Sequence, residues 1–340
     1  MLLTIVIPTL NRDYCVARAI DSALAQTSSD VDIIVSNNGS TDKTRAIIDG
    51  YADPRLRVFH HPSTMPVAVH SNLLINEARG ELIVALSDDD WFEPTFAERM
   101  LRLFDQHPEL SFAYARCWVH VGGRASPSPA GPEVEDTLPF FQSYFAGGRH
   151  LFWCACVTRT AELRKLFPVP PDVQLGDMYL WTQLAFDGPV GCVPELVAHY
   201  TYLVDNASLG IPVSKWAEET RQLMLRIERR YRENGADPAA LQSLTQSMEK
   251  YLARTTANQF ALNASKGASK LSLLRALRSS GALLVPDLAM AVPRVAASLM
   301  LPTPVIKRLV LSFSASRSRW ARTESAAPAA VAETSAARPA

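Results

Sequence analysis

Three consecutive aspartates, residues 88–90, follow one serine and a short apolar run, residues 82–86. An apolar run of this length predicts a buried parallel strand, and open α/β sheets bind their ligands at the carboxyl ends of such strands. Three neighbouring carboxylates repel one another unless they are solvated, protonated or neutralised by a cation. Mg²⁺ prefers one or two carboxylates together with substrate phosphates. Two interpretations stay open at this point: a metal site for a phosphorylated ligand, and a solvated acidic turn before a helix that begins near Thr95.

A fourth aspartate, Asp177, stands directly before an apolar helical pattern at residues 178–186. An aspartate at such a position is typical of a helix N-cap, where its carboxylate accepts hydrogen bonds from free backbone N–H groups. Considered alone, Asp177 is therefore interpreted as a helix cap.

The elements that would hold the three aspartates alternate between strand and helix. The hydrophobic pattern predicts strands at residues 2–7, 31–35, 56–60 and 81–87, and helices at residues 13–26, 41–50, 67–78 and 95–106. This alternation predicts a doubly wound α/β sheet with mostly parallel strands. Polar turns at residues 9–12, 36–42 and 87–90 then meet at one edge of the sheet, as in a nucleotide pocket. No G-x-G-x-x-G sequence and no P-loop occurs, which disfavours dinucleotide-binding enzymes and P-loop NTPases.

The later part of the chain shows the same kinds of pattern. It predicts strands at residues 111–119, 151–158, 190–193 and 196–202, helices at 159–167, 178–186, 215–233 and 237–264, and a mobile loop rich in Gly, Pro and Ser at 122–133. Cys154 and Cys156 would share one face of their strand and are expected in the core. Five cysteines without a C-x-x-C pair suit the reduced cytosol. The first residues predict a strand rather than a signal peptide.

The charge is unevenly distributed, although the formal net charge is zero. Residues 265–322 hold ten Lys and Arg against one acid, Asp287, and they are broken by prolines. None of their apolar runs reaches the ~20 residues that a membrane span needs. This region is interpreted either as helices lying on an anionic bilayer or as a helical subdomain that packs on the rest. The overall balance gives no indication of nucleic acid binding, and no nucleic acid partner is predicted.

Four stretches together resemble the family 2 glycosyltransferases, which have the GT-A fold: TIVIPTLNR at 4–12, IIVSNNGSTD at 33–42, NLLINEARGELIVALSDDDWFEP at 72–94 and GDMYLW at 176–181. The resemblance covers the first ~210 residues and rests on the order and spacing of the stretches. It implies a catalytic domain at residues 1–212. The pattern and composition that follow predict a helical, basic region at 213–322 and a disordered tail rich in Ala, Ser and Pro at 323–340. The implied activity is inverting transfer of a sugar from a nucleoside-diphosphate sugar (UDP, dTDP or GDP) to an acceptor hydroxyl.

The resemblance also implies roles for single residues. The nucleotide-binding set would be Thr9, Asn11, Arg12, Asn38, Asn72 and Asp88, with Asp88 near the ribose. This chain departs from the family pattern at three places, because Asn37 and Asn38 replace frequent aspartates, Ser71 replaces a frequent arginine, and Ser87 replaces the first acid of the D-x-D sequence. An amide is both donor and acceptor, so base binding can survive while the identity of the base stays open.

Asp89 matches the family's ligand for Mn²⁺ or Mg²⁺, and Asp177 matches its catalytic base. The metal would stabilise the negative charge of the departing diphosphate, and the base would take the proton of the acceptor hydroxyl. Asp90 is interpreted as a supporting residue. His199 lies near the position of a histidine ligand in some members, but a plain strand residue is the favoured interpretation. Trp91, Trp153 and Trp181 could stack on sugars, with buried packing as the default.

The acceptor is expected to be a carbohydrate or a lipid-linked sugar of the cell envelope. The protein is expected in the cytoplasm, with contact to an anionic inner membrane face through residues 265–322. Two alternatives stay open. One is a nucleotidyltransferase, which would need a Gly- and Lys/Arg-rich phosphate loop near the N-terminus that is absent here. The other is an inactive protein that binds nucleotide sugars or carbohydrates.

Overall fold

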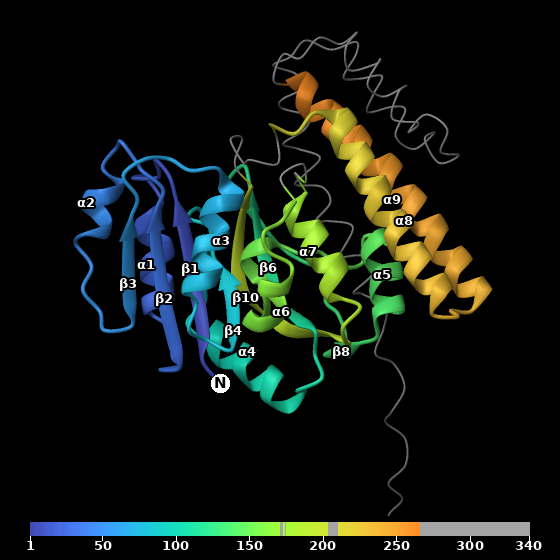
Figure 1. Cartoon of the computed structure of the whole chain (residues 1–340), viewed down its shortest axis with the longest axis horizontal. Coiled ribbons are helices and arrows are strands. Elements are labelled where there is room, and N and C mark those ends of the chain that lie inside the picture. The colour runs from blue at the N-terminus through green and yellow to red at the C-terminus, as the bar shows by residue number, and fades with distance from the viewer. Residues whose placement is uncertain (171–172, 174, 203–209, 266–340) are drawn as a thin grey trace, which may run out of the picture.

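The computed structural model describes residues 1–170, 173, 175–202 and 210–265. The strands within these residues form one mixed sheet in the spatial order β3-β2-β1-β4-β9-β6-β10-β5, with β7 paired to β6 and β8 paired to β10 (Figure 1). The long pairings, β3 with β2, β2 with β1, β1 with β4 and β6 with β10, are parallel. The predicted α/β class with a mostly parallel sheet flanked by helices and followed by a helical region is confirmed.

The elements have the following bounds. The strands are β1 (Leu3–Thr9), β2 (Val31–Asn37), β3 (Leu56–His60), β4 (Leu82–Ala85), β5 (Trp91–Phe92), β6 (Phe112–Val121), β7 (Arg124–Pro127), β8 (Val134–Glu135), β9 (Cys156–Arg159) and β10 (Val190–Tyr202). The helices are α1 (Val16–Leu24), α2 (Thr44–Ile48), α3 (Val67–Glu77), α4 (Phe96–Gln106), α5 (Thr137–Ala146), the 3-10 turn η1 (Trp153–Ala155), α6 (Thr160–Lys165), α7 (Gly176–Leu184), α8 (Val213–Glu233) and α9 (Pro238–Ser265).

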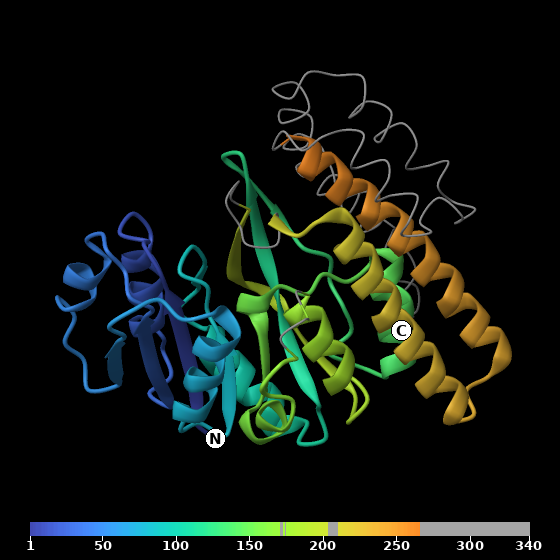
Figure 2. The same cartoon turned by 45° about the horizontal axis from the view of Figure 1, so that its top comes forward.

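Helices cover both faces of the sheet because side chains alternate along each strand. On β1, Leu3, Ile5 and Ile7 join a hydrophobic cluster with α1 and α4, whereas Val6 joins a second cluster with α3, α5 and α7. The helices α8 and α9 lie side by side and add their apolar residues to this second cluster (Figure 2). The two helices therefore share a core with the half of the sheet that contains β6 and β10.

Several boundaries differ from the sequence prediction, and hydrogen bonding explains most of the differences. The predicted strands at 190–193 and 196–202 are one strand, β10, whose pairing with β6 shifts register between Val193 and Ala198. The predicted loop at 122–133 contains β7, which folds back on β6 through two glycines with positive φ, Gly122 and Gly123. β5, β8 and α5 were not predicted. Short strands and an aromatic-rich helix give little periodic signal.

The predicted strand at 151–158 is half wrong, because η1 occupies its centre and only the last residues form β9. Cys154 and Cys156 therefore do not share a face: Cys154 belongs to the cluster with α1 and α4, and Cys156 to the cluster with α3 and α7. Both are buried, so the expectation of core cysteines is confirmed. All five cysteines are buried and free.

Two predicted regions fall beyond this description. The basic region at 265–322, apart from Ser265, and the tail at 323–340 lie outside the described residues. Within the part of the chain that the structure describes, no helix combines the length and the apolar character needed to cross a membrane.

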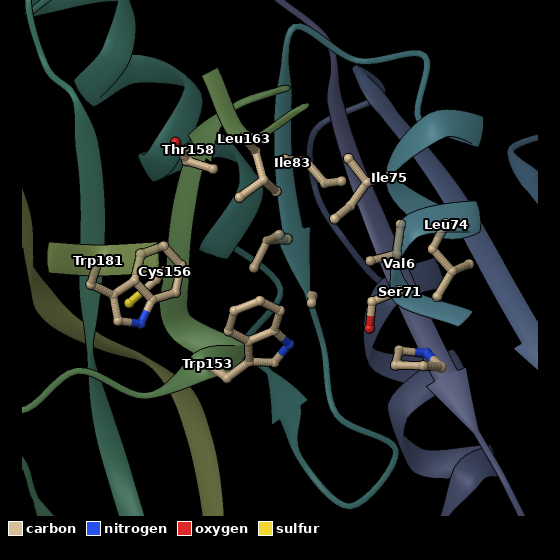
Figure 3. A pocket seen from close by; sticks show the side chains of 13 residues that line it. Val6, Ser71, Leu74, Ile75, Ile83, Trp153, Cys156, Thr158, Leu163 and Trp181 are labelled. Carbon is tan, nitrogen blue, oxygen red and sulfur yellow. The ribbon is translucent and has the colours of Figure 1, made fainter. Parts of the chain in front are cut away.

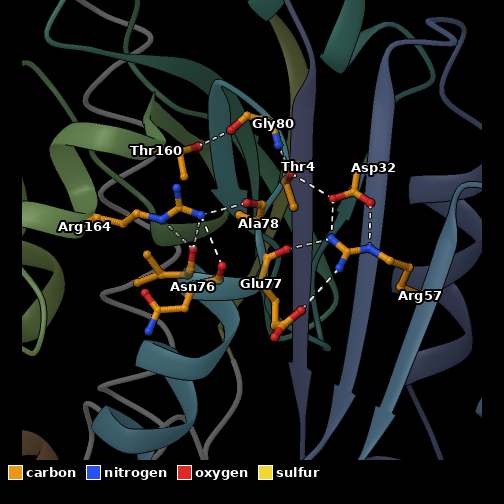
Figure 4. Close-up of polar contacts among 10 residues, drawn as sticks. Thr4, Asp32, Arg57, Asn76, Glu77, Ala78, Gly80, Thr160 and Arg164 are labelled. Carbon is orange, nitrogen blue, oxygen red and sulfur yellow. Dashed lines mark hydrogen bonds and ion pairs between the residues drawn. The ribbon is translucent and has the colours of Figure 1, made fainter.

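A polar network joins four strands at the edge opposite the three polar turns (Figure 4). Arg57 on β3 donates from Nε and Nη2 to the two carboxylate oxygens of Asp32 on β2, at 2.9 and 2.7 Å. The hydroxyl of Thr4 on β1 donates to Asp32 at 3.0 Å and accepts the N–H of Gly80 at 2.8 Å. A Cβ at Gly80 would lie 2.5 Å from the carbonyl oxygen of Leu2, so no larger residue fits there.

The network continues to α3 and α6. The guanidinium of Arg164 donates to the free carbonyl groups at the end of α3, namely those of Ile75, Asn76 and Ala78. The Thr160 hydroxyl donates to the carbonyl of Gly80 at 2.7 Å. The amino edge of β4 is thus fixed to both neighbouring helices, which sets the position of the aspartates at its other end.

We predict that Asp32→Asn lowers the free energy of unfolding by about 3 kcal/mol, because it leaves the guanidinium of Arg57 without its buried partner. Urea unfolding followed by circular dichroism measures the change. The matched control is Asp187→Asn, whose carboxylate lies 3.9 Å from Arg230 Nη2 on the surface and should change stability by less than ~1 kcal/mol. Equal losses in the two variants would contradict the prediction.

Candidate active site

The first two polar turns are joined by hydrogen bonds. Asn11 has a left-handed backbone, with φ of 54°, a conformation that asparagine tolerates better than most residues. Its N–H donates to the Ser40 hydroxyl at 2.9 Å, and its side-chain oxygen accepts the N–H of Thr41 at 2.8 Å. The N–H of Arg12 donates to the Thr44 hydroxyl at 2.8 Å. Asn11 therefore positions the turn after β1 against the turn after β2.

The third polar turn meets the first at Asp88. Arg12 Nε lies 3.5 Å from Asp88 Oδ1 in a partly buried ion pair. Burial raises the pKa of Asp88 to about 6, while the Thr9 hydroxyl and the Arg12 guanidinium act in the opposite direction. The Thr9 hydroxyl is buried and makes no hydrogen bond of good geometry. The structure thus brings Thr9, Arg12 and Asp88 together, as the sequence predicts.

Asp89 and Asp90 have different surroundings from Asp88. Asp89 is buried, and its carbonyl oxygen accepts a hydrogen bond from Arg18 Nη2 at 2.7 Å. Asp90 is 1% exposed and accepts the N–H of Thr201, on β10, at 2.7 Å. Burial, and then the charge of Asp89, raise the pKa of Asp90 to about 8. Asp90 therefore ties the acidic turn to β10, in agreement with its predicted supporting role.

Trp91 is packed on both faces. The guanidinium of Arg18 lies 3.7 Å from one of its ring centroids, and the rings of His199 and His120 lie 4.4 and 4.7 Å from it. The two ring nitrogens of His199 are within hydrogen-bond distance of Glu93 Oε1, at 2.8 Å, and of His120 Nε2, at 3.0 Å. These contacts fit the packing interpretation of Trp91 and the interpretation of His199 as a plain strand residue, and both interpretations stay predictions.

Arg18 is a functional candidate that the sequence did not single out. It holds the backbone of Asp89 and covers Trp91, so it links α1 to the acidic turn. In the sequence it is one polar residue of an amphipathic helix, and nothing in its spacing indicates a partner 71 residues away. Only the sheet order, which places β1 beside β4, brings the two segments together.

The side chain of Asn38 forms hydrogen bonds within the protein. Its side-chain amide donates to the carbonyl of Met65 at 3.0 Å and accepts the N–H of Met65 at 2.9 Å. Gly39, with φ of 77°, lets the same loop approach, since a Cβ there would lie 2.6 Å from the backbone of Ser63. An aspartate could accept from Met65 but not donate to it. The asparagine in place of the family's frequent aspartate therefore fits a backbone partner.

Two further residues named above are Asn37, at the carboxyl end of β2, and Asn72, on α3. Asn37 is buried, and its side-chain oxygen accepts the N–H of Ser40 at 2.9 Å while its amide nitrogen faces His60. Asn72 is half-buried on α3. Neither the role of Asn38 nor that of Asn72 in nucleotide binding follows from these contacts, and both stay predictions.

Asp177 lies in the first turn of α7 but does not cap it, because Leu175 occupies the N-cap position. The cap interpretation is therefore wrong. The Asp177 carboxylate accepts the N–H of the adjacent Met178 at 2.8 Å and is open to solvent. Dense protein around this exposed group desolvates it and raises its pKa above the ordinary aspartate value. The structure thus presents a solvent-accessible carboxylate of raised basicity.

A buried histidine cluster stands behind the turn after β2. The Ser36 hydroxyl lies between His70 Nε2, at 2.7 Å, and His61 Nε2, at 3.0 Å. Burial, and then the neighbouring His61, lower the pKa of His70 to about 4. His70 is therefore neutral in the folded protein near pH 7.

Comparison with known proteins matches the first part of the chain to a family. Residues 4–150 match the family described as Glycosyl transferase family 2. The chain is 35% identical to the chondroitin synthase of Pasteurella multocida (strain Pm70) over a segment of 115 residues. This segment makes up 33% of this chain and 12% of that protein. It is 33% identical to the putative glycosyltransferase EpsH of Bacillus subtilis (strain 168) over a segment of 109 residues. This segment makes up 32% of this chain and 31% of that protein. The chain thus spans less than a third of either relative.

Solved structures show the same fold at low sequence identity. The structure of S. aureus TarS 1–349 in complex with UDP-GlcNAc superposes with a TM-score of 0.64 at 16% identity, covering 88% of this chain and 89% of that chain. The mannosyltransferase PcManGT from Pyrobaculum calidifontis, in complex with GDP-Man and Mn²⁺, gives a TM-score of 0.52 at 17% identity, covering 90% and 86%. The predicted GT-A fold is confirmed.

We predict that the fold loses stability as the pH falls from about 6.5 toward 4, because the unfolded chain binds a proton at His70 that the folded protein excludes. At about 1.4 kcal/mol per pKa unit, the loss attributable to His70 is at most roughly 3 kcal/mol. Urea unfolding at a series of pH values should show a shallower pH dependence in His70→Gln. His107→Gln, which changes a surface histidine, should retain the parent slope, and identical slopes in all three proteins would contradict the assignment.

Proposed function

We propose that this chain, whose residues 4–150 match glycosyl transferase family 2, is a member of that family and transfers a sugar from a nucleoside-diphosphate sugar to an acceptor hydroxyl with inversion at the sugar carbon. The observation that carries the proposal is the meeting of Thr9, Arg12 and Asp88 at the carboxyl edge of β1 and β4. This is the edge at which α/β sheets bind nucleotides. A guanidinium and a buried hydroxyl without a hydrogen bond of good geometry suit the oxygens of a diphosphate.

The residues at this edge fit a divalent cation. Asp88 is half-buried and the adjacent Asp89 is buried. Burial raises the pKa of Asp88, so a nearby positive charge would stabilise its ionised form. Mg²⁺ and Mn²⁺ are commonly held by one or two carboxylates with phosphate oxygens completing the shell. We assign Asp89 as the ligand, with Asp88 toward the ribose. When bound, the cation would stabilise the charge of the leaving diphosphate. PcManGT, whose complex contains GDP-Man and Mn²⁺, supports this assignment.

Asp177 supplies the base of the proposed reaction. Its carboxylate is accessible to an acceptor, and its raised pKa brings its basicity closer to neutral pH. A general base works best when its pKa lies near the working pH. In the proposed step, Asp177 takes the proton of the acceptor hydroxyl while that oxygen attacks the sugar carbon and the diphosphate departs on the opposite side. No second carboxylic acid is needed, since the leaving group is already acidic.

We propose a carbohydrate or lipid-linked acceptor in the synthesis of an envelope polysaccharide. The similarity to chondroitin synthase supports a carbohydrate product. Free, buried cysteines support a cytoplasmic location, and the excess of basic residues at 265–322 supports contact with an anionic membrane surface. The division into a catalytic domain at 1–212 and a basic helical region at 213–322 belongs to the same proposal.

A second candidate is a protein that binds nucleotide sugars without turnover. Two observations favour it. The Asn38 amide is occupied by Met65, and Ser87 stands where the family has the first acid of the D-x-D sequence. The accessible carboxylate of Asp177 has no role in this alternative, so the two candidates differ in what its removal does.

We predict that one nucleoside diphosphate among UDP, GDP and dTDP raises the melting temperature by several degrees in the presence of Mn²⁺, with CMP as a further comparison. A ligand at 100 times its dissociation constant stabilises a protein by about 2.7 kcal/mol. Asp89→Ala should abolish the part of the shift that depends on Mn²⁺. Asp105→Ala, which removes an exposed carboxylate on α4, should retain it. No shift with any nucleotide would refute the proposed donor class.

We predict that Asp177→Asn lowers turnover by about 10²- to 10⁴-fold, the range expected for loss of a general base. Donor binding should be unchanged, because Asp177 lies on α7 and not among the residues around Asp88. Release of nucleoside diphosphate from the donor that the melting experiment selects, with a mixture of oligosaccharide acceptors, measures turnover. Asp187→Asn, just beyond the other end of α7, is the control. A parent protein that binds the donor but shows no turnover supports the second candidate.

A further inference from the structure

The two faces of the sheet offer different neighbours to the acidic turn at residues 87–90. On the face that packs against α3, an apolar slot lies between α3, α6 and α7 (Figure 3). The slot reaches Ala85, three residues before Asp88, and none of the described residues that line it is charged. The cationic neighbours of the turn are Arg12, from the turn after β1, and Arg18, from α1 on the other face.

The peptide group between Asp89 and Asp90 is fixed at both of its ends. Its N–H, which belongs to Asp90, donates to the carbonyl oxygen of Ser87 at 3.1 Å and closes the turn. Its carbonyl oxygen, which belongs to Asp89, accepts from Arg18 Nη2 at 2.7 Å. The orientation of this peptide plane sets ψ of Asp89, one of the two soft dihedrals of a residue. The two hydrogen bonds therefore fix the backbone from which the Asp89 carboxylate projects.

Arg18 is itself held in place. Its backbone belongs to α1, whose inward-facing residues are buried in the core. Its guanidinium lies 3.7 Å from a ring centroid of Trp91, two residues after Asp89, and Trp91 pairs in turn with His199 on β10. A planar guanidinium can lie on an aromatic ring and still donate within its own plane. Arg18 thus contacts the same short segment twice, at the carbonyl of Asp89 and at the ring of Trp91.

The position of Asp89 matters because it is the one protein ligand assigned above to the divalent cation. Ser87, which replaces the first acid of the D-x-D sequence, cannot supply a second carboxylate. Residues that orient a metal ligand typically contribute about 10- to 100-fold in metal affinity. The positive charge of Arg18 has the opposite effect, because like charges repel. Any gain in cation affinity from Arg18 therefore comes from geometry.

We propose that Arg18 is a positioning residue, which fixes the main chain of Asp89 so that its carboxylate is aimed at the divalent cation. The inference rests on the proposed function, because the cation belongs to the donor site described there. The sign of the effect is distinctive. Removing a nearby positive charge by itself tightens the binding of a cation, so weaker binding in a folded variant without the guanidinium identifies a loss of position.

The test replaces Arg18 with methionine in the full chain. Arg18 is an exposed residue, so Arg18→Met should retain the circular dichroism spectrum and the urea midpoint of the parent. Mn²⁺ affinity is measured by electron paramagnetic resonance of free Mn²⁺, with the nucleoside diphosphate that the melting experiment selects. It should fall about tenfold. Arg18→Lys keeps the charge and a donor but not the planar stack on Trp91, so it should recover part of the loss.

The matched control is Arg116→Met. The guanidinium of Arg116 also donates to backbone carbonyl groups, those of Ser128 and Pro194, but these lie outside the acidic turn. This variant should keep the parent affinity for Mn²⁺. If Arg18→Met does not fold, Arg18→Lys carries the test, and it should still bind Mn²⁺ more weakly than the parent.

Hydrogen exchange followed by mass spectrometry tests the positioning without metal or nucleotide. A peptide that covers residues 86–93 should exchange faster in Arg18→Met than in the parent, and a peptide that covers residues 112–121 should not. Unchanged exchange at 86–93 would overturn the proposal.

The binding measurements separate this inference from the proposed function. Equal or tighter Mn²⁺ binding in Arg18→Met would overturn the positioning role and leave the proposed function intact. Weaker binding of the nucleoside diphosphate in EDTA would also overturn it, because Arg18 would then contact the ligand directly. A parent protein that binds no Mn²⁺ would refute the proposed metal site, and with it the role of Arg18 toward the cation, whatever the exchange at residues 86–93.

Discussion

The main constraint on this structure is the cost of holding three carboxylates at the end of one buried strand. Burial and mutual repulsion oppose ionisation of Asp88 and Asp90. Each of the three aspartates is held by a different neighbouring group. Arg12 faces Asp88, Arg18 holds the backbone of Asp89, and the N–H of Thr201 binds Asp90. The three contacts come from the turn after β1, from α1 and from β10, so the acidic turn is fixed only when the sheet is complete.

The two ends of the sheet differ in their polar contacts. The contacts at the amino edge stabilise the fold, whereas those at the carboxyl edge suit ligand binding. At the amino edge, Asp32, Arg57, Thr4 and Gly80 are joined to one another by hydrogen bonds. At the carboxyl edge, the buried hydroxyl of Thr9 makes no hydrogen bond of good geometry and the carboxylate of Asp177 is open to solvent. A buried polar group that is poorly paired destabilises a fold, and such groups are expected at functional sites.

The sequence predicted the parts of the fold that depend on local pattern. Buried strands such as β1, β2 and β4 are visible in the sequence as apolar runs. The polar turns that follow such strands predicted that Thr9, Arg12 and Asp88 lie on one edge of the sheet. It did not predict contacts that depend on sheet order, such as Arg18 with Asp89 or His199 with Trp91, because the partners are 71 and 108 residues apart in the chain. Considered alone, Asp177 was interpreted as a cap, although the resemblance implied a catalytic base, since one aspartate before an apolar run cannot show at which residue the helix begins.

Asn38, which replaces a frequent aspartate of the family, connects a local sequence difference to the position of a neighbouring loop. An aspartate there would face the carbonyl of Met65 with a second negative oxygen, whereas the asparagine gives that carbonyl a donor and also accepts the N–H of Met65. Gly39 is required beside it because any Cβ would strike the backbone of Ser63. The residue that differs from the family pattern thus sets how closely the loop at 61–66 approaches the end of β2. His61, in that loop, lies 3.0 Å from the Ser36 hydroxyl, which also contacts the buried His70. The position of the loop is therefore coupled to this polar cluster as well as to Asn38.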